Sequence, residues 1–390
     1  MNKKIIIDDK KIDVLLERGV ENVYPSKDEL KKALISGKKL SIYNGIDPTG
    51  PTLHIGHGAT LLKLRELQDL GHDIILLIGD FTGRIGDPTD KSAVRKQLST
   101  KEITKNLKNY TKQAGLILDI KKVKVKFNSK WLAKLTFAEV VELASEFTLQ
   151  QMIERDMFDK RIKAGQPVHL HEFLYPLMQG YDSVAMNVDM EIGGNDQTFN
   201  MLVGRTMMKN RGKEKYVLTT KLLVDPTGKK MGKSEGNMVT LEDNPGEMFG
   251  KVMSWPDSLI PLAFEICTRT QIPSEISDPK STKLKLAFEI TKIYHGEKKA
   301  KEAQDSWEKT FSKKEIPNEV EVINTKEGEL LVDVLVKNTF VSSKTEFRRL
   351  IDTGSITHMD SNKKIMNPHE KVSNGVYKIG KKRFCKIETK

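Results

Sequence analysis

The chain has 390 residues, which is enough for two or three domains with a substantial buried core. A formal net charge of +12 and a pI of about 9.3 favour a polyanionic partner, although a well-solvated basic surface would give the same balance. The two cysteines, Cys267 and Cys385, are far apart and lack metal-site spacing, which argues against a disulfide framework or a structural zinc and for a reducing cytoplasm.

The first nine residues carry too short an apolar run for a secretory signal, and they include acidic residues that a transit peptide lacks. No run in the sequence is long enough to span a bilayer. We therefore expect a cytoplasmic protein with no membrane partner.

After a polar helix expected at 10–18, the first candidate strand covers residues 40–45 and runs into a turn with Asp47 and Pro48. Strands that end in a glycine-containing turn place side chains at the carboxyl edge of a parallel sheet, where doubly wound folds bind ligands. Tyr43 and Asp47 are thus candidates to face a ligand. A half-buried strand aromatic and an ordinary turn residue are the alternative interpretations.

The next segment, Leu53-His54-Ile55-Gly56-His57-Gly58, precedes an amphipathic run from Ala59 to Leu70 and a second apolar run at 74–78. This order predicts a strand, a helix and a strand. Two imidazoles would lie on the opening turn of the helix, where glycines allow close approach and the helix N-terminus attracts phosphate. A cap histidine beside a core histidine is the plainer alternative.

A glycine-rich loop at 79–88 should bring Asp87 back to the same sheet edge. The segments 100–115 and 137–157 are helical and charged, as expected of an insertion packed outside the sheet. In the helical stretch 170–184, Tyr175, Gln179 and Asp182 are spaced by four and three residues and would share one face. A ligand would explain this polar trio, and so would a solvent-facing side of the helix.

Residues 190–197 read as a strand end, a glycine turn and a helix start, with Asn195 as the cap and Asp196 and Gln197 free to meet a ribose or an amino acid. A strand at 216–223 then leads to the lysine-rich loop Asp225-Pro226-Thr227-Gly228-Lys229-Lys230-Met231-Gly232-Lys233-Ser234. This loop is not a Walker loop, because three residues separate its glycines where four are needed and no apolar helix follows. A solvated basic loop remains the alternative.

From Pro245 the sequence becomes helix-rich and basic, and 316–327 is typical of a linker. Ser343-Lys344-Thr345-Glu346 is a capping box that opens a helix with Lys344 and Arg348 opposite its apolar face. Short lysine-rich strands follow to the end. This tail resembles the S4-like RNA-binding module, and a solvated lysine-rich terminus is the alternative.

The pair His-x-Gly-His and Lys-Met-x-Lys-Ser, in this order, resembles the two signatures of class I aminoacyl-tRNA synthetases. Over its whole length the chain resembles the bacterial-type tyrosyl-tRNA synthetases. The matching motifs are Tyr43 to Thr49, His54 to His57, Thr82 to Pro88, Tyr175 to Asp182, Gly193 to Gln197 and Lys230 to Ser234. Phe199 departs from the tryptophan of many relatives, which bears on local packing and subfamily.

The resemblance implies an α/β fold with a doubly wound, Rossmann-like parallel sheet in a catalytic domain at 1–244, which carries a helical insertion at about 115–185. A helical domain at 245–322 would bind the anticodon arm, and a small α+β S4-like domain at 328–390 would bind RNA through Lys344, Arg348 and Arg349. It also implies a homodimer, with residues 130–175 near the interface.

The implied function is activation of L-tyrosine with ATP and Mg²⁺, followed by transfer of tyrosine to tRNA(Tyr), with no tightly bound cofactor and no metal held by the protein. The tyrosine-binding residues would be Tyr43 and Asp182 at the phenolic hydroxyl, Tyr175, Gln179 and Asp87 at the ammonium group, and Asp47 and Gln197 nearby. The catalytic residues at the triphosphate would be Thr49, His54, His57, Lys230 and Lys233. Further ATP contacts would come from Gly45, Gly56, Gly193, Asp196, Met231 and Ser234, together with Lys233.

Three other functions stay open at this point. A tryptophanyl-tRNA synthetase shares both signatures and the fold, but Tyr43 and Asp182 suit a hydroxyl. A non-catalytic RNA-binding or splicing protein on a synthetase scaffold would also explain the basic tail. A small nucleotidylyltransferase fits the histidine motif but not the helical and S4-like extensions.

Overall fold

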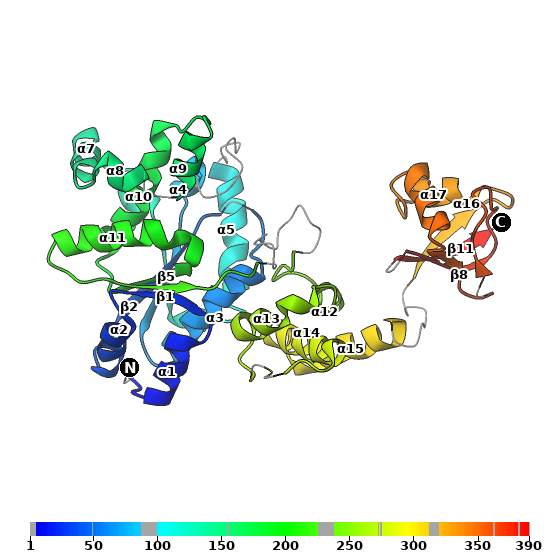
Figure 1. Ribbon diagram of the computed structural model, residues 1–390, viewed down its shortest axis with the longest axis horizontal. Helices are drawn as coiled ribbons and strands as arrows, with labels where there is room; N and C mark the ends of the chain where they lie inside the picture. The colour runs from blue at the N-terminus through cyan, green and yellow to red at the C-terminus, as the bar shows by residue number, and fades with distance from the viewer. Residues whose placement is uncertain are drawn as a thin grey trace. The chain divides into compact units, whose positions relative to one another are not determined.

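The computed structural model describes residues 5–48, 50–86, 100–153, 156–224, 238–271, 273, 275–311, 320–361, 363–380 and 383–389. The chain divides into two compact units, residues 1–300 and residues 301–390, each with its own core (Figure 1). In the described residues, no helix is long and apolar enough to cross a membrane.

The first unit is built on a six-stranded sheet with strand order β1-β6-β5-β2-β3-β4. Its strands are β1 (Val20–Tyr24), β2 (Ser41–Ile46), β3 (Asp73–Ile78), β4 (Val123–Phe127), β5 (Met190–Gly194) and β6 (Tyr216–Thr220). All neighbours are parallel except β1, which pairs antiparallel with β6. The chain moves outward from β2 to β4 and returns to β5 on the other side of β2, so the sheet is doubly wound as expected.

Burial explains the strand sequences. Residues 74–78 of β3 are all buried apolar side chains, as is usual for a parallel strand covered on both faces.

Helices α10 and α11 lie on one side of the sheet with α7, α8 and α9 beyond them, and α1 and α2 lie on the other side (Figure 1). The helices before residue 245 are α1 (Asp9–Glu17), α2 (Lys27–Ile35), α3 (Ile55–Asp69), α4 (Thr82–Ile85), α5 (Thr100–Ala114), α6 (Ser129–Leu132), α7 (Phe137–Ser145), α8 (Leu149–Ile153), α9 (Asp156–Lys163), α10 (Leu170–Met186) and α11 (Thr198–Asn210).

Some sequence-based expectations are met in this unit, and others need correction. The helix expected to open at the two histidines begins at Ile55, with His54 as its cap. The helical pattern expected over 137–157 is present as α7, α8 and the start of α9. The strand expected to reach residue 223 ends at Thr220, after which the chain leaves the sheet. Strand β4 falls within the range 115–185 and belongs to the central sheet.

The described residues between 245 and 311 form four further α-helices: α12 (Pro245–Met253), α13 (Ile260–Cys267), α14 (Pro279–His295) and α15 (Glu297–Phe311). Helix α13 packs on both α3 and α14. Arg18 at the end of α1 donates to the carbonyl oxygens of Phe264 at 2.5 Å and Glu265 at 2.9 Å. These contacts join the helices to the sheet-bearing part of the same unit.

The second unit contains the end of α15 and a five-stranded sheet of order β7-β11-β10-β8-β9, and its described residues form two more helices. The elements are β7 (Glu321–Thr325), α16 (Leu331–Lys337), α17 (Lys344–Asp352), β8 (Ile356–His358), β9 (Lys363–Lys364), β10 (Gly375–Ile379) and β11 (Arg383–Thr389). Phe347 and Ile351 of α17 pack into its apolar core, as their spacing predicts. The expected linker at 316–327 is wrong where β7 pairs with β11.

Candidate active site

A cavity of about 540 Å³ lies at the carboxyl ends of the central parallel strands, where the sheet changes direction between β2 and β5. Twelve of the residues that the sequence singled out line it: Tyr43, Gly45, Asp47, His54, Gly56, His57, Tyr175, Gln179, Asp182, Gly193, Asp196 and Gln197. Thr49, Asp87, Lys230, Met231, Lys233 and Ser234 lie outside the described residues. Lys344, Arg348 and Arg349 are in the second unit.

One end of the cavity presents buried hydroxyl and carboxylate groups. Tyr43 and Asp182 are almost fully buried, and the Tyr43 hydroxyl is 2.8 Å from Ser183 Oγ. Asp182 accepts hydrogen bonds from Trp131 Nε1 at 2.7 Å and Asn128 Nδ2 at 3.3 Å. Burial raises the pKa of the Asp182 carboxyl well above its usual range, and the two donors oppose that shift. The polar face of α10, formed by Tyr175, Gln179 and Asp182, therefore faces the cavity rather than solvent.

A second group fixes the carboxylate of Asp47. Tyr175 donates its hydroxyl to one Asp47 oxygen at 2.8 Å, and Thr82 donates to the other at 2.7 Å. Asn128 Nδ2 also donates to Thr82 Oγ1 at 3.0 Å, so one amide links Asp47 to Asp182. A Cβ at Gly79 would lie 1.8 Å from Asp47 Oδ1, which shows why the chain has glycine there.

Amide side chains form the next part of the wall. Gln179 Nε2 donates to Glu191 Oε1 at 3.1 Å. Asn200 Nδ2 donates to both Gln179 Oε1 at 2.9 Å and Gln197 Oε1 at 3.1 Å. Asn200 is buried on α11 and holds two residues of the cavity in one orientation.

The two histidines cap helix α3 and face the same cavity. His54 Nδ1 accepts from the amide of Gly56 at 3.1 Å, and His57 Nδ1 accepts from the amide of His54 at 3.2 Å. Burial and the neighbouring His54 ring lower the pKa of His57 to about 3. His57 is therefore neutral at physiological pH and carries its proton on Nε2, which can donate a hydrogen bond. The cap interpretation is confirmed, and both histidines also line the cavity; their contact with a ligand stays a prediction.

The chain that follows the lysine-rich segment is joined to the histidine motif. The Ile55 amide donates to the Val239 carbonyl at 3.0 Å, and the Leu241 amide donates to the Leu53 carbonyl at 2.9 Å. His54 and Thr240 form an antiparallel bridge between these bonds. Residues 222–223 and 238–239, which flank the segment 225–237 outside the described residues, line the cavity.

Several lining or supporting residues were not found from the sequence. Asn128 and Trp131 follow β4, and their only local signal is a polar residue directly after a strand. Glu191 lies in a strand and Asn200 in a helix, each among apolar residues, and Lys215 lies in the charged segment just before β6, so nothing local marks any of them as buried polar groups. In the described residues, no group of three or more histidine, cysteine or acidic side chains could hold a metal ion.

The doubly wound sheet and the cavity at its switch point define a nucleotide-binding domain of the class I synthetase type. Residues 36–312 match the model of the family described as tRNA synthetases class I (W and Y). The tyrosine–tRNA ligase of Carboxydothermus hydrogenoformans is 43% identical over 96% of each chain, and that of Thermotoga maritima is 42% identical over 96% of each. The chain therefore belongs to the tyrosine–tRNA ligase family of class I synthetases.

Solved structures give the same fold. A C-terminally truncated mitochondrial tyrosyl-tRNA synthetase of Coccidioides posadasii matches with a TM-score of 0.62 and 25% identity, over 76% of this chain and 91% of that one. The tyrosyl-tRNA synthetase of Archaeoglobus fulgidus complexed with L-tyrosine has a TM-score of 0.60 and 23% identity, over 76% of this chain and 100% of that one.

Proposed function

We propose that this enzyme activates L-tyrosine with ATP and transfers the tyrosyl group to the 3′ end of tRNA(Tyr). One observation carries the proposal: Tyr43 and Asp182 lie in the same cavity as the histidine-capped start of α3. A buried hydroxyl and a buried carboxylate thus share one cavity with a helix N-terminus suited to phosphate. The 42–43% identity to tyrosine–tRNA ligases supports it.

Amino-acid activation requires the two substrates to be aligned, and it does not require a strong base. The tyrosine carboxylate, already ionised, attacks the α-phosphorus of ATP, and pyrophosphate leaves with the electron pair of the broken phosphorus–oxygen bond. His57 donates from Nε2 where charge develops on the phosphates, and His54 lies beside it with 3.9 Å between the ring centroids. Thr49, Lys230, Met231, Lys233 and Ser234 are proposed to act at the phosphates as well, and Mg²⁺ enters with ATP as part of that substrate.

Tyrosine would be held at both ends. Asp182 accepts a hydrogen bond from the phenolic O–H, since Trp131 and Asn128 already hold that carboxylate in place. Asp47, Gln179 and Gln197 line the part of the wall that suits the α-ammonium group, with Asp87 proposed beside them. On the nucleotide side, Gly45, Gly56, Gly193 and Asp196 line the cavity and are proposed to meet the ATP ribose and phosphates.

The discriminating experiment is ATP–pyrophosphate exchange with tyrosine or tryptophan as the amino acid, because the matching family model includes both specificities. We expect exchange with tyrosine only. Exchange that depends on tryptophan would make this a tryptophanyl enzyme, and no exchange with either would favour an RNA-binding protein on a synthetase scaffold.

We propose that the second unit binds tRNA through α17, where Lys344, Arg348 and Arg349 are all exposed. Phosphate contacts release counterions, so removing Arg348 and Arg349 together should weaken tRNA binding and reduce its salt dependence. Alanine at the exposed Lys337 of α16 is the matched control. Binding and salt slope unchanged in the double variant would contradict the assignment. We also propose that the protein acts in the cytoplasm, where it would meet tRNA.

We also propose that two copies pair through the helices between β4 and β5. Phe137 is 84% exposed on α7 and Leu170 is 85% exposed on α10, with Val141 and Leu149 exposed as well. Large exposed apolar side chains grouped on neighbouring helices are typical of an interface. Aspartate at Phe137 and Leu170 should turn a dimer into a monomer by light scattering, whereas aspartate at the exposed Val14 of α1 should not.

A further inference from the structure

Lys215 is a fully buried lysine that lies behind the cavity and does not line it. Its ammonium group has three donors and three partners: the Glu191 carboxylate, Ser183 Oγ at 2.7 Å and the Met201 carbonyl at 3.2 Å. Its Nζ also lies 5.6 Å from the centre of the Tyr43 ring. Gly204 makes room for it, since a Cβ there would lie 2.6 Å from Nζ.

Two chains of hydrogen bonds run from this ammonium group to the cavity. Through Ser183 it reaches the Tyr43 hydroxyl, 2.8 Å from Ser183 Oγ. Through Glu191 it reaches the Gln179 amide, 3.1 Å from Glu191 Oε1. Tyr43 and Gln179 both line the cavity, so one lysine fixes two of its polar walls.

The ammonium group also sets the direction of the first chain. Because it has only donors, Ser183 Oγ accepts from it and can donate its own proton to Tyr43. Tyr43 then donates its O–H either to the nearby Glu191 carboxylate or to a hydroxyl in the cavity, beside the accepting carboxylate of Asp182. One donor and one acceptor are what a phenolic hydroxyl needs, whereas the ring of phenylalanine would leave both unpaired.

We propose that Lys215 is a positioning residue for tyrosine recognition, which acts through Ser183 on Tyr43 and through Glu191 on Gln179. This proposal rests on the proposed function and names a group that sets its specificity. An uncharged residue could fill the space, but it could not satisfy a carboxylate, a hydroxyl and a carbonyl at once.

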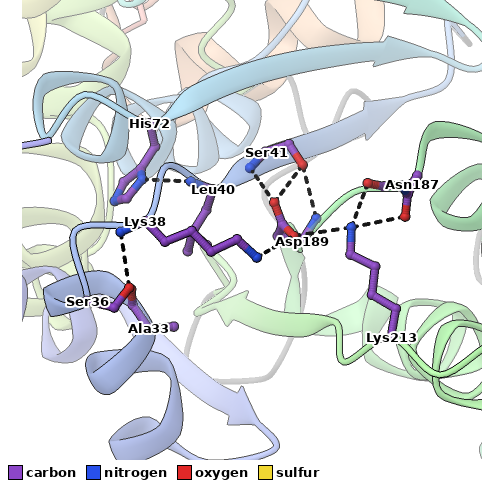
Figure 2. A network of polar contacts seen from close by, with 9 residues as sticks. All are labelled: Ala33, Ser36, Lys38, Leu40, Ser41, His72, Asn187, Asp189 and Lys213. Carbon is purple, nitrogen blue, oxygen red and sulfur yellow. Dashed lines mark hydrogen bonds and ion pairs between the residues drawn. The ribbon is translucent and has the colours of Figure 1, made fainter. Parts of the chain in front are cut away.

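Two residues earlier in the chain, Lys213 provides a matched control. Its ammonium group lies 2.7 Å from the Asn187 carbonyl and 3.2 Å from Asp189 Oδ1, at the opposite end of the sheet (Figure 2). Asp189 also accepts from the Ser41 amide at 2.9 Å and pairs with Lys38. Lys213→Met thus removes a lysine–carboxylate pair of similar type without touching the cavity.

The test compares Lys215→Met and Lys213→Met with the natural enzyme in amino-acid-dependent pyrophosphate exchange. For Lys215→Met we expect the tyrosine KM to rise and the preference for tyrosine over phenylalanine in kcat/KM to fall, each by about tenfold or more. The ATP KM should change by less than about twofold, and Lys213→Met should match the natural enzyme in all three values. An unchanged tyrosine preference in a folded Lys215→Met enzyme would overturn the proposal.

Leaving Glu191 buried without its partner could prevent folding. The double variant Lys215→Met with Glu191→Gln removes that charge, and its far-ultraviolet circular dichroism and thermal midpoint report whether it folds. The double variant should still lose the preference for tyrosine, and retention of the natural preference would again overturn the proposal. If the natural enzyme shows no tyrosine-dependent exchange, the proposed function fails instead, and the two failures are thus distinguished.

Discussion

Tyr175 donates its hydroxyl to the carboxylate of Asp47 at 2.8 Å across 128 residues of sequence. Thr82 holds the other oxygen, so two neutral donors fix this charge at the edge of the cavity. Removing one of them with Tyr175→Phe should raise the tyrosine KM about tenfold and leave the ATP KM unchanged, because a hydrogen bond to a charged group contributes about 1.5–3 kcal/mol. Tyr216→Phe, in β6, is the control. A normal tyrosine KM in Tyr175→Phe would mean that Asp47 does not meet the substrate.

Asp182 should dominate selection of the phenolic hydroxyl. Both Asp182→Ala and Asp182→Asn should reduce the preference for tyrosine over phenylalanine by about tenfold or more, since an unpaired buried polar group costs about 1–3 kcal/mol. Pyrophosphate exchange at several concentrations of each amino acid measures this ratio. If Asp182→Ala keeps the natural ratio, the hydroxyl is recognised elsewhere.

Lys233 should act on the activation rate and not on tyrosine affinity. This residue lies outside the described part of the chain, and we propose from its motif that it acts at the phosphates, where a cation is needed as pyrophosphate leaves. Lys233→Ala should slow single-turnover adenylate formation with little change in tyrosine affinity. Lys229→Ala, in the same segment but outside the motif, serves for comparison. An unaltered rate of pyrophosphate exchange in Lys233→Ala would show that Lys233 does not act in the activation step.

Gly58 on α3 leaves space for the hydroxyl of Tyr294 on α14. A Cβ at Gly58 would lie 2.1 Å from that oxygen, which is buried and has no hydrogen-bond partner among the residues that the structure describes. Gly58→Ala should reduce the free energy of unfolding by about 1–3 kcal/mol. Adding Tyr294→Phe should restore at least half of the loss, since the next ring atom is 3.3 Å away. Denaturant melts measure the free energy of unfolding of each variant. If the effects of Gly58→Ala and Tyr294→Phe on this free energy simply add, the contact between the two residues is not direct.

His72 should make stability depend on pH. Its Nδ1 accepts from the Leu40 amide at 3.2 Å (Figure 2), and burial lowers the pKa of His72 to about 4. The unfolded chain binds the proton near its ordinary pKa of 6.5, so this stabilisation is complete above that pH and is lost as the pH falls toward 4. Between pH 7 and pH 5 the loss should be about 1–2 kcal/mol.

The variant His72→Asn keeps an acceptor that does not titrate, so its stability should fall less between these pH values than that of the natural protein. Urea melts at both pH values measure the difference. His369→Asn, at an exposed position of the second unit, should leave the pH dependence as it was. Equal pH dependence in His72→Asn and the natural protein would place the titrating group elsewhere.

Local sequence patterns predicted much of the fold. The apolar run of β3, the glycine turns and the helix caps are short-range signals, and the sheet they predicted is present. The pattern could not predict that β1 pairs antiparallel with β6, because a short half-exposed strand takes its partner from tertiary packing. The cavity brings together residues of the sequence motifs, yet Asn128, Asn200 and Lys215 were missed because only distant contacts explain a buried polar group.

Backbone hydrogen bonds tie Leu53 and Ile55 to residues 239 and 241. During synthesis on the ribosome, a nascent chain has all of the histidine motif long before it has the partner segment 239–241. Loop closure over so many residues is entropically costly and slow. The catalytic pocket is therefore completed late, after the segment around Leu241 has left the exit tunnel, and a truncated translation product that stops earlier lacks this closure altogether.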